Sequence, residues 1–260
     1  MQVFKFGGAS VKNADNIKNI SSIISTYHSS ELLVVVSAIN KTTNKLEDVI
    51  NAYFNQNGDY FGFLEEIKQE HFQILHDLFE DAAHPVFDDV ANTFVEVEWI
   101  LEEDPQDPYD YLYDQIVSLG EILSSKVVAA YLSHIGMNAK CIDARDYIHT
   151  DNTYREAKVN WVLTEDKIRR DLPLILDNNI VITQGFIGST SENFTTTLGR
   201  EGSDYTAAIF ASCLNAEDIT IWKDVPGVLN ADPKWFAETE LIPELSYTDA
   251  IELTYYGATV

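Results

Sequence analysis

A lysine inside an apolar run, followed directly by two glycines, is the first pattern in this sequence that could do chemistry. Lys5 lies in the run over residues 3–6, and Gly7 and Gly8 separate it from a helical pattern. A buried lysine is costly unless an anion pairs with it, and paired glycines let backbone N–H groups approach phosphate oxygens near a helix N-terminus. The pattern favours a phosphate site, but by itself it fits equally well a strand turn whose lysine reaches the surface.

Hydroxyl side chains follow the second apolar run, over residues 32–37. Ser37 ends this run and Thr43 comes shortly after it, at the carboxyl end of the predicted strand, where open α/β sheets bind their ligands. These hydroxyl groups could hold a substrate carboxylate. The alternative is a polar loop in which Thr43 caps a helix that begins near Asn44.

A glycine and a glutamate interrupt the apolar face of a long helix predicted to begin near Tyr109. A glycine inside a helix costs about 1 kcal/mol relative to alanine, so Gly120 is expected to leave room for a neighbouring group. Glu121, beside it, could pair with an ammonium group of a substrate. A solvated glutamate on an amphipathic helix is the alternative.

A glycine-flanked arginine precedes a Ser-Asp pair at the start of another predicted helix. The guanidinium fork of Arg200 suits a carboxylate, and Asp204, in the first turn, could orient a reacting group or a magnesium ion. In the alternative interpretation Ser203 caps the helix, Asp204 complements its dipole and Arg200 is a solvated loop cation. Tyr205 is expected on the inner face of this helix.

The last pattern is an apolar run over residues 219–225 that leads into a Pro-Gly turn. Such a loop can wrap a purine, with Lys223 and Lys234 near the phosphates, and an ordinary turn after a strand is the alternative. Each of the five patterns is weak alone. Because all of them lie beside strand ends or helix starts, their agreement favours one functional site.

Apolar runs that alternate with helical patterns predict an α/β fold whose mainly parallel sheet is flanked by helices. The five runs cover residues 3–6, 32–37, 139–143, 180–186 and 219–225. Between the first two runs, Asn13 can cap a helix. Residues 61–97 are acidic and helical in period, and they are too long for a simple crossover, which predicts an inserted helical hairpin.

The composition argues against several classes of protein. With 17 Lys and Arg against 42 Asp and Glu, the formal net charge is −25, which argues against a nucleic-acid or anionic-membrane partner. Cys141 and Cys213 lie in apolar surroundings without disulfide or metal spacing, so we expect buried reduced thiols. No apolar run approaches the roughly 18 residues of a membrane span, and no secretory leader is evident. We therefore expect a soluble, cytoplasmic protein.

With these patterns together, the chain resembles the aspartate kinases of the amino-acid kinase family over nearly its whole length. The motifs occur in family order, as Lys5-Phe6-Gly7-Gly8, residues 37–44, Ser118-Leu119-Gly120-Glu121, residues 199–204 and residues 221–227. The resemblance implies a three-layer α/β/α sandwich with a mainly parallel central sheet. It also implies one kinase domain over residues 1–260, with a helical insertion at residues 58–108.

The activity implied by the resemblance is transfer of a phosphoryl group from ATP, with Mg²⁺, to the β-carboxylate of L-aspartate, the first step of lysine, threonine and methionine biosynthesis. By resemblance, Lys5 and Asp204 are the catalytic residues, and no dedicated metal site is expected. The residues implied to hold L-aspartate are Ser37, Thr43, Glu121 and Arg200. Those implied to lie around the nucleotide are Lys5, Gly7, Gly8, Lys223, Asp224, Leu229, Lys234 and Thr259. A homodimer is also implied.

Three departures from the family pattern concern the nucleotide. Thr259 stands where the family usually has a lysine, Leu229 replaces an aromatic residue, and Lys223 replaces a threonine. Lys223 could compensate for the cation missing at Thr259. The chain ends at Val260, before the last strand of the kinase domain and the ligand-sensing ACT domains of the family, so we expect a fragment of a longer protein.

Two alternatives stay open at this point. One is another kinase of the same family, acting on acetylglutamate, glutamate or UMP. The other is a non-catalytic regulatory or binding module that keeps the fold.

Overall fold

The computed structural model describes residues 1–28 and 31–258. The chain divides into two units, Met1–Trp222 and Lys223–Val260, and the first unit contains the central sheet. The predicted nucleotide residue Thr259 lies outside the described residues.

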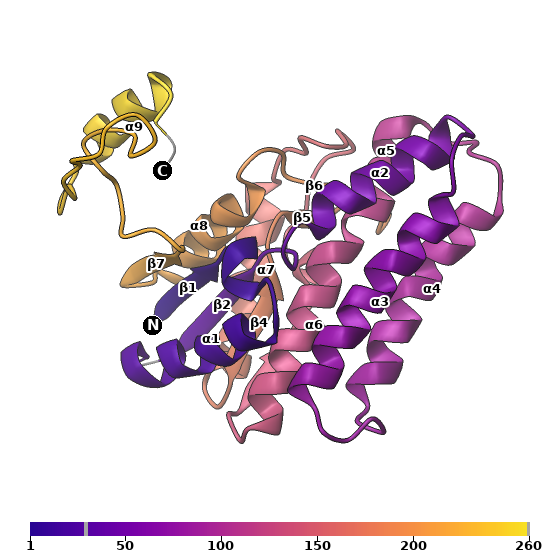
Figure 1. Ribbon diagram of the computed structural model, residues 1–260. Coiled ribbons are helices and arrows are strands. Elements are labelled where there is room, and N and C mark those ends of the chain that lie inside the picture. The colour runs from indigo at the N-terminus through magenta and orange to yellow at the C-terminus, as the bar shows by residue number, and fades with distance from the viewer. Residues whose placement is uncertain (29–30, 259–260) are drawn as a thin grey trace. The chain divides into compact units, whose positions relative to one another are not determined.

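Five strands form the parallel sheet that the sequence predicts (Figure 1). Their order is β3-β4-β2-β1-β7, and every neighbouring pair is parallel. The strands are β1 (Gln2–Phe6), β2 (Leu32–Val36), β3 (Ala139–Cys141), β4 (Ile180–Gln184) and β7 (Asp218–Trp222). All five predicted strands are present. The last four end earlier than predicted, because the chain turns away from the sheet at residues such as Ser37 and Gly185.

The register aligns the carboxyl ends of β1, β2, β4 and β7. Phe6 pairs with Val36 on one side and with Trp222 on the other, and Val36 pairs with Gln184. The segments that follow these strands therefore leave the sheet at one edge. Ser10, after β1, reaches across this edge and donates a hydrogen bond of 3.2 Å to the Trp222 carbonyl.

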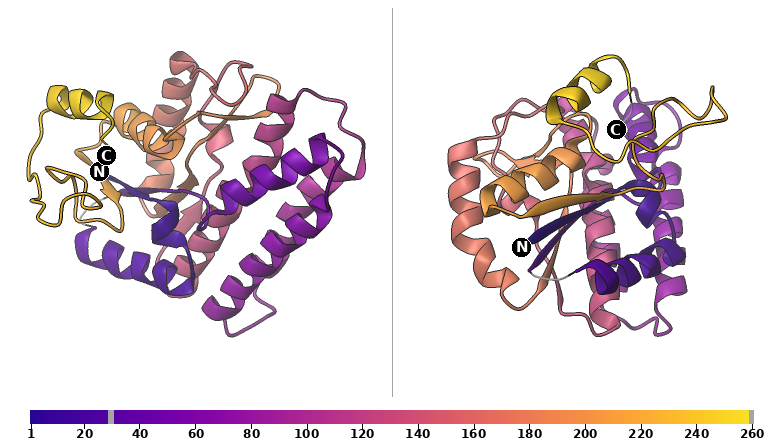
Figure 2. Two further views of the ribbon diagram at one scale, coloured as in Figure 1. Left: turned by 45° about the horizontal axis from the view of Figure 1, so that its top comes forward. Right: turned by 90° about the vertical axis from the view of Figure 1, so that its left-hand side faces the viewer.

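Helices cover both faces of the sheet, as the predicted three-layer sandwich requires. Phe4 and Phe6 of β1 face a hydrophobic cluster with α1 (Ala14–Tyr27) and α6 (Leu119–His134). Val3, next to Phe4 on the strand, faces a second cluster with α7 (Trp161–Leu176) and α8 (Gly202–Leu214), and Figure 2 shows these helix pairs on opposite sides. The predicted cap of α1 is confirmed, because Asn13 accepts a hydrogen bond of 2.9 Å from the Asn16 N–H.

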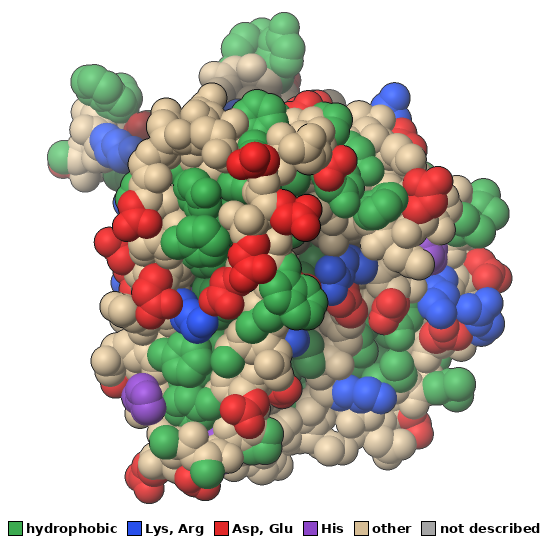
Figure 3. Space-filling view, turned by 90° about the vertical axis from the view of Figure 1, so that its right-hand side faces the viewer, with side chains coloured by type: hydrophobic (Ala, Val, Ile, Leu, Met, Phe, Trp, Pro, Cys, Tyr) green, Lys and Arg blue, Asp and Glu red, His purple; other side chains and the backbone are tan. Residues whose placement is uncertain are grey.

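Three helices follow β2, namely α2 (Thr42–Phe54), α3 (Tyr60–Leu78) and α4 (Val86–Glu102), and the last two lie within the insertion predicted at residues 58–108. The hairpin predicted over residues 61–97 is confirmed as α3 and α4. Asp59 caps α3 by accepting a hydrogen bond of 2.8 Å from the Gly62 N–H. Buried side chains of α3 and α4 join the same cluster as Phe4 and Phe6, while Asp and Glu side chains spread over the outer face (Figure 3).

The predicted long helix from Tyr109 is two helices, α5 (Tyr109–Val117) and α6, which meet at Ser118. Their combined stretch, Tyr109–His134, is long and apolar enough to cross a membrane, so the expectation that no segment meets this criterion was wrong. Within the protein, 83% of its most apolar window is buried. This is the exposure of a core helix in a folded domain.

Short elements that the sequence did not predict complete the first unit. β5 (Ile187–Ser189) and β6 (Thr195–Thr197) form an antiparallel pair. Two 3₁₀ turns, η1 (Gly8–Val11) and η2 (Ala144–Asp146), follow β1 and β3. In the second unit, α9 (Tyr247–Tyr255) is capped by Ser246.

The two cysteines differ from the expectation of buried thiols. Cys213, on the inner face of α8, is buried as predicted, but Cys141 is exposed. Cys141 is the last residue of β3, which lies at the end of the strand order. Its thiol nevertheless lies near Ser125 of α6, and burial raises the pKa of this thiol to about 11.

The stability of the insertion is expected to depend on pH through His71, a fully buried residue of α3. Burial lowers the pKa of His71, against the opposing effect of its 2.8 Å contact with the Ile67 carbonyl. The unfolded chain binds this proton near pH 6.5, whereas the folded chain binds it only at lower pH. Stability is therefore present above pH ~6.5 and is lost as the pH falls below it.

Urea melts between pH 5 and 8 test this expectation. The midpoint should fall towards pH 5 in the natural protein, and His71→Gln should flatten that dependence. His76→Gln removes an exposed histidine of the same helix and should leave the dependence unchanged. Identical pH profiles for the natural protein and His71→Gln would contradict the assignment.

Candidate active site

The turns that follow β1, β2 and β4 lie side by side at the carboxyl edge of the sheet. The Ser37 N–H donates to the Phe6 carbonyl at 3.0 Å, and the Gly185 N–H donates to the Val36 carbonyl at 2.9 Å. The Asn40 N–H donates to the Gly8 carbonyl at 3.3 Å. The predicted residues Gly7, Gly8 and Ser37 are therefore brought together at one place.

Glycine is required at this edge because backbones approach each other closely. A methyl group on Gly8 would lie 2.9 Å from the Asn40 carbonyl oxygen and 3.0 Å from that of Ala38. A methyl group on Gly185 would lie 2.5 Å from the Ser203 Cβ. These glycines let the loop after β2 and the start of α8 reach the strand ends.

Lys5 and Asp204 form an ion pair at this edge. The Lys5 Nζ lies 2.6 Å from the Asp204 Oδ1, and the two side chains are 7% and 20% exposed. Lys5 comes from β1 and Asp204 from the first turn of α8. The interpretation in which Lys5 reaches the surface was therefore wrong, since its charge is held inside the protein by a carboxylate.

The start of α8 leaves backbone N–H groups without a side-chain cap. Glu201 occupies the N-cap position in a left-handed conformation, with φ 54°, and makes no capping hydrogen bond. Ser203 lies inside the helix, so the interpretation in which it caps the helix was wrong. The Gly202 and Asp204 N–H groups donate to the Gly199 and Glu201 carbonyls at 3.1 Å and 3.0 Å, so it is mainly the helix dipole that favours a bound anion here.

Arg200 stands just before this helix start and is exposed. Gly199, with φ 78°, turns the chain there. Tyr205 is 39% exposed and does not lie on the inner face of α8, contrary to prediction.

Glu121 lies in the first turn of α6 and is 3% exposed, so it is not a solvated glutamate. Burial raises the pKa of its carboxyl to about 8, opposed by hydrogen bonds from its own backbone, from the Ala38 backbone and from the Thr43 side chain. Among the described residues, its Oε2 has no hydrogen-bond partner. A buried carboxylate with one oxygen left unpaired is suited to receive a cationic group.

The loop after β2 connects the two halves of the site. A methyl group on Gly120 would lie 3.0 Å from the Ala38 Cβ and 3.2 Å from the Thr42 Cγ2, so Gly120 makes room for this loop, as predicted. Ala38 thus contacts the glycine turn on one side and the start of α6 on the other. Thr43 does not cap α2, which begins at Thr42, and its side chain is directed to Glu121 instead.

Phe186 is a residue of this site that the sequence patterns did not reveal. It follows Gly185 in a left-handed conformation, with φ 71°, and its ring would lie 2.6 Å from a methyl group on Gly202. Its N–H donates to the Thr206 hydroxyl at 3.0 Å, and its carbonyl accepts from the Leu198 N–H at 2.8 Å. The apolar run over residues 180–186 predicted a strand through this position, so the turn could not be recognised from the sequence.

Four predicted nucleotide residues belong to the second unit. Lys223, Asp224 and Lys234 are exposed there, and Leu229 is half-buried and bridges to Leu241. Their contacts with a nucleotide, like that of Thr259, stay predictions. Among residues 1–28 and 31–258, no group of three His, Cys, Asp or Glu side chains could hold a metal ion.

Comparison with known proteins gives consistent matches along the chain. Residues 1–260 match the family model described as "Amino acid kinase family". The chain is 32% identical to lysine-sensitive aspartokinase 3 of Escherichia coli, over 99% of this chain and 56% of that protein. It is also 32% identical to a chloroplastic bifunctional aspartokinase/homoserine dehydrogenase 2 of Arabidopsis thaliana, over 99% of this chain and 28% of that protein.

A solved structure matches the fold closely. The crystal structure of E. coli aspartokinase III in complex with aspartate and ADP superposes with a TM-score of 0.89 at 30% identity, over 98% of this chain and 56% of that one. The chain thus spans between about a quarter and about half of the length of these relatives. The family model covers every residue, and the chain therefore belongs to the amino acid kinase family.

Proposed function

We propose that this chain is the catalytic part of an aspartate kinase, which transfers the γ-phosphoryl group of ATP to the β-carboxylate of L-aspartate. The observation that carries the proposal is the division of the site into two halves. A buried, partly unpaired carboxylate at Glu121 suits an ammonium group, and a buried Lys5 beside an uncapped helix start suits phosphate. The aspartate and ADP in the matching E. coli structure support the same assignment.

L-Aspartate occupies the half of the site built on α6 and the loop after β2. Its ammonium group pairs with Glu121, and this positive charge favours the ionised form of a carboxyl whose pKa burial raises to about 8. Thr43 orients Glu121, while Ser37 and Arg200 take the carboxylates. Glu121 and Arg200 thus carry charges complementary to the ammonium group and the carboxylates of the amino acid, and Thr43 and Ser37 add hydroxyl groups that can form hydrogen bonds.

The phosphoryl group is transferred at the Lys5 half of the site. Lys5 neutralises charge on the transferring group, and the Gly7 and Gly8 N–H groups hold phosphate oxygens. Asp204 organises this centre, and its carboxylate together with nucleotide phosphates supplies the oxygen ligands that Mg²⁺ prefers. The attacking β-carboxylate is already ionised at neutral pH, so the reaction requires positioning and charge stabilisation rather than a general base.

The residues proposed to bind the nucleotide also include Lys223, Asp224, Leu229, Lys234 and Thr259, as the family resemblance implies. The acidic composition and the family resemblance further support a cytoplasmic enzyme that forms a homodimer and binds neither nucleic acid nor membrane.

Trapping with hydroxylamine tests the proposed reaction directly. With Mg-ATP and L-aspartate, the protein should yield aspartyl hydroxamate, because an acyl phosphate reacts with hydroxylamine. Glutamate, acetylglutamate and UMP, the last assayed by ADP release, should give at most a small fraction of that rate. Turnover of one of these substrates instead of aspartate would assign another kinase activity, and binding of ATP without any turnover would favour the regulatory module.

Substitution of Lys5 should remove much of the transition-state stabilisation. We expect Lys5→Ala to lower kcat by about 100- to 1,000-fold, the effect of removing one donor that meets developing charge, which is on the order of 3 kcal/mol. Lys12→Ala removes an exposed lysine in the next turn and serves as the control, with activity unchanged. An active Lys5→Ala enzyme would exclude the assigned role.

Substitution of Glu121 should affect aspartate more than ATP. Glu121→Gln keeps the size of the side chain but loses its charge, so the KM for aspartate should rise about 10- to 100-fold, as for loss of a charge-assisted hydrogen bond, with the KM for ATP nearly constant. Glu65→Gln, on an exposed position of α3, is the control.

The pH dependence provides an independent readout of Glu121. Below pH 8 the empty site holds a proton on this carboxyl, and binding of an ammonium group must displace it. Aspartate affinity of the natural protein should therefore increase from pH 6 to pH 8, and the Glu121→Gln variant should lack this increase. A similar slope in both proteins would assign the ammonium group to another residue.

A further inference from the structure

Asp114 of α5 is a buried carboxylate outside the candidate active site, and its contacts join three segments. It is 0% exposed. Its Oδ2 accepts hydrogen bonds from the Arg155 N–H at 3.0 Å and the Thr197 N–H at 2.8 Å. Its Oδ1 accepts a third, of 2.7 Å, from the Thr197 hydroxyl. One side chain thus ties α5 to β6 and to the turn at Arg155.

Gln115, the next residue, holds the other end of β6. Its side-chain amide donates to the Thr195 carbonyl at 2.9 Å, and its side-chain oxygen accepts from the Thr195 N–H at 3.1 Å. The Thr197 carbonyl accepts from the Ala157 N–H at 2.9 Å. On the edge of β6 away from β5, most backbone N–H and carbonyl groups therefore find their hydrogen-bond partners in side chains of α5.

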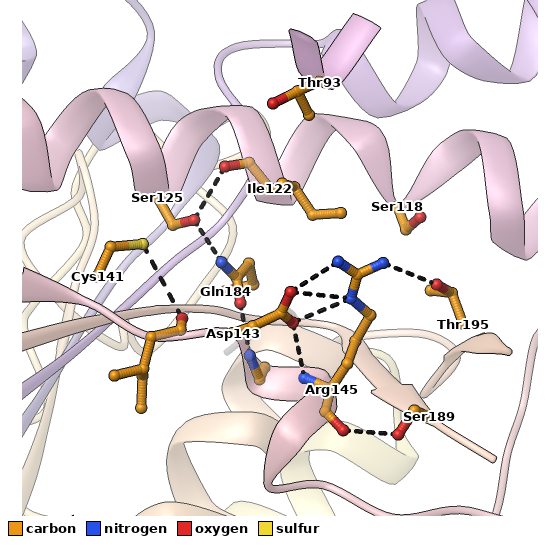
Figure 4. Close-up of polar contacts among 12 residues, drawn as sticks. Thr93, Ser118, Ile122, Ser125, Cys141, Asp143, Arg145, Gln184, Ser189 and Thr195 are labelled. Carbon is orange, nitrogen blue, oxygen red and sulfur yellow. Dashed lines mark hydrogen bonds and ion pairs between the residues drawn. The ribbon is translucent and has the colours of Figure 1, made fainter. Parts of the chain in front are cut away.

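The β5–β6 pair is also held from η2. Figure 4 shows the Arg145 guanidinium between Asp143 and Thr195, with hydrogen bonds of 2.6 Å from its Nη2 to Asp143 and 3.1 Å from its Nη1 to the Thr195 hydroxyl. The Ser189 hydroxyl donates to the Arg145 carbonyl at 2.6 Å. Contacts from two sides leave this hairpin little freedom to shift.

The two elements that Asp114 joins, α5 and β6, each lead along the chain to a residue proposed to bind aspartate. On one side, α5 passes through Ser118 into α6, and Glu121 lies in the first turn of α6. The Ser118 hydroxyl donates to the Gln115 carbonyl at 3.3 Å. On the other side, β6 continues through Leu198 and Gly199 to Arg200. Asp114 thus connects the element that carries Glu121 to the strand that leads to Arg200.

We propose that Asp114 is a positioning residue that sets the spacing between Glu121 and Arg200, and so the fit of the site to the length of its amino-acid substrate. This inference rests on the proposed aspartate kinase function. Asp114 touches neither substrate nor nucleotide, and it acts through the backbone of β6. Its loss therefore impairs recognition of aspartate while the Lys5 half of the site is preserved.

Two substitutions separate this role from the charge of Asp114. Asp114→Ala removes all three hydrogen bonds. Asp114→Asn can keep the geometry, because its oxygen can accept from both N–H groups while its amide donates to the Thr197 hydroxyl oxygen. The positioning role predicts a severe effect of alanine and rescue by asparagine.

Steady-state kinetics of aspartyl hydroxamate formation provide the test. Asp114→Ala should raise the KM for aspartate about 10- to 100-fold, as for a small misplacement of a binding group. Its KM for ATP should change less than about twofold. The KM for aspartate of Asp114→Asn should stay within about threefold of that of the natural protein. Asp59→Ala removes a carboxylate that also accepts a backbone N–H, but far from the site at the start of α3, and should leave both KM values unchanged.

Gln115→Ala provides a second route if Asp114→Ala does not fold. Gln115 is only half-buried and holds the same strand, so its removal should also raise the KM for aspartate selectively. Equal changes in both KM values, or an unchanged KM for aspartate in a folded variant, would overturn the positioning role. Absence of aspartyl hydroxamate from the folded natural protein would instead overturn the proposed function, and this inference with it.

Discussion

The ion pair between Lys5 and Asp204 is the interaction on which the arrangement of the candidate site depends. Two charges taken out of water are tolerated only when they face each other closely, and here this requires β1 and the start of α8 to meet. Gly185 allows the meeting because it admits Ser203, and Gly8 admits the loop after β2. The pair thereby gathers segments that are far apart in the sequence around one edge of the sheet.

The two halves of the site present groups of opposite charge, the carboxyl of Glu121 and the ammonium of Lys5. Glu121 faces one side of the Ala38 loop, and the Lys5 half of the site lies on the other. A zwitterionic amino acid and an anionic nucleotide each meet a complementary group in such a layout. The net charge of −25 does not prevent this, because charges beyond about 8 Å are screened at physiological salt.

Elements that are encoded locally could be predicted from the sequence. The five strands appear as apolar runs, the Asn13 cap directly precedes its helix, and the glycines after β1 indicate the turn. The β5–β6 pair could not be predicted, because Thr195 is held by Gln115 from a distant helix. The site was predicted as a set of residue types, whereas the pairing of Lys5 with Asp204 and the left-handed turn at Phe186 depend on tertiary contacts.

The interior position of β1, between β2 and β7 in the sheet, affects the order in which the chain folds. β1 pairs with β2 soon after both are made, but its other neighbour is β7, where Gln2 aligns with Asp218. Contacts of such large sequence separation form slowly. During synthesis one edge of β1 stays open until β7 emerges from the ribosome, and an open strand edge can pair with another chain. The late arrival of β7 therefore makes β1 the strand at which we expect pairing with other chains during synthesis.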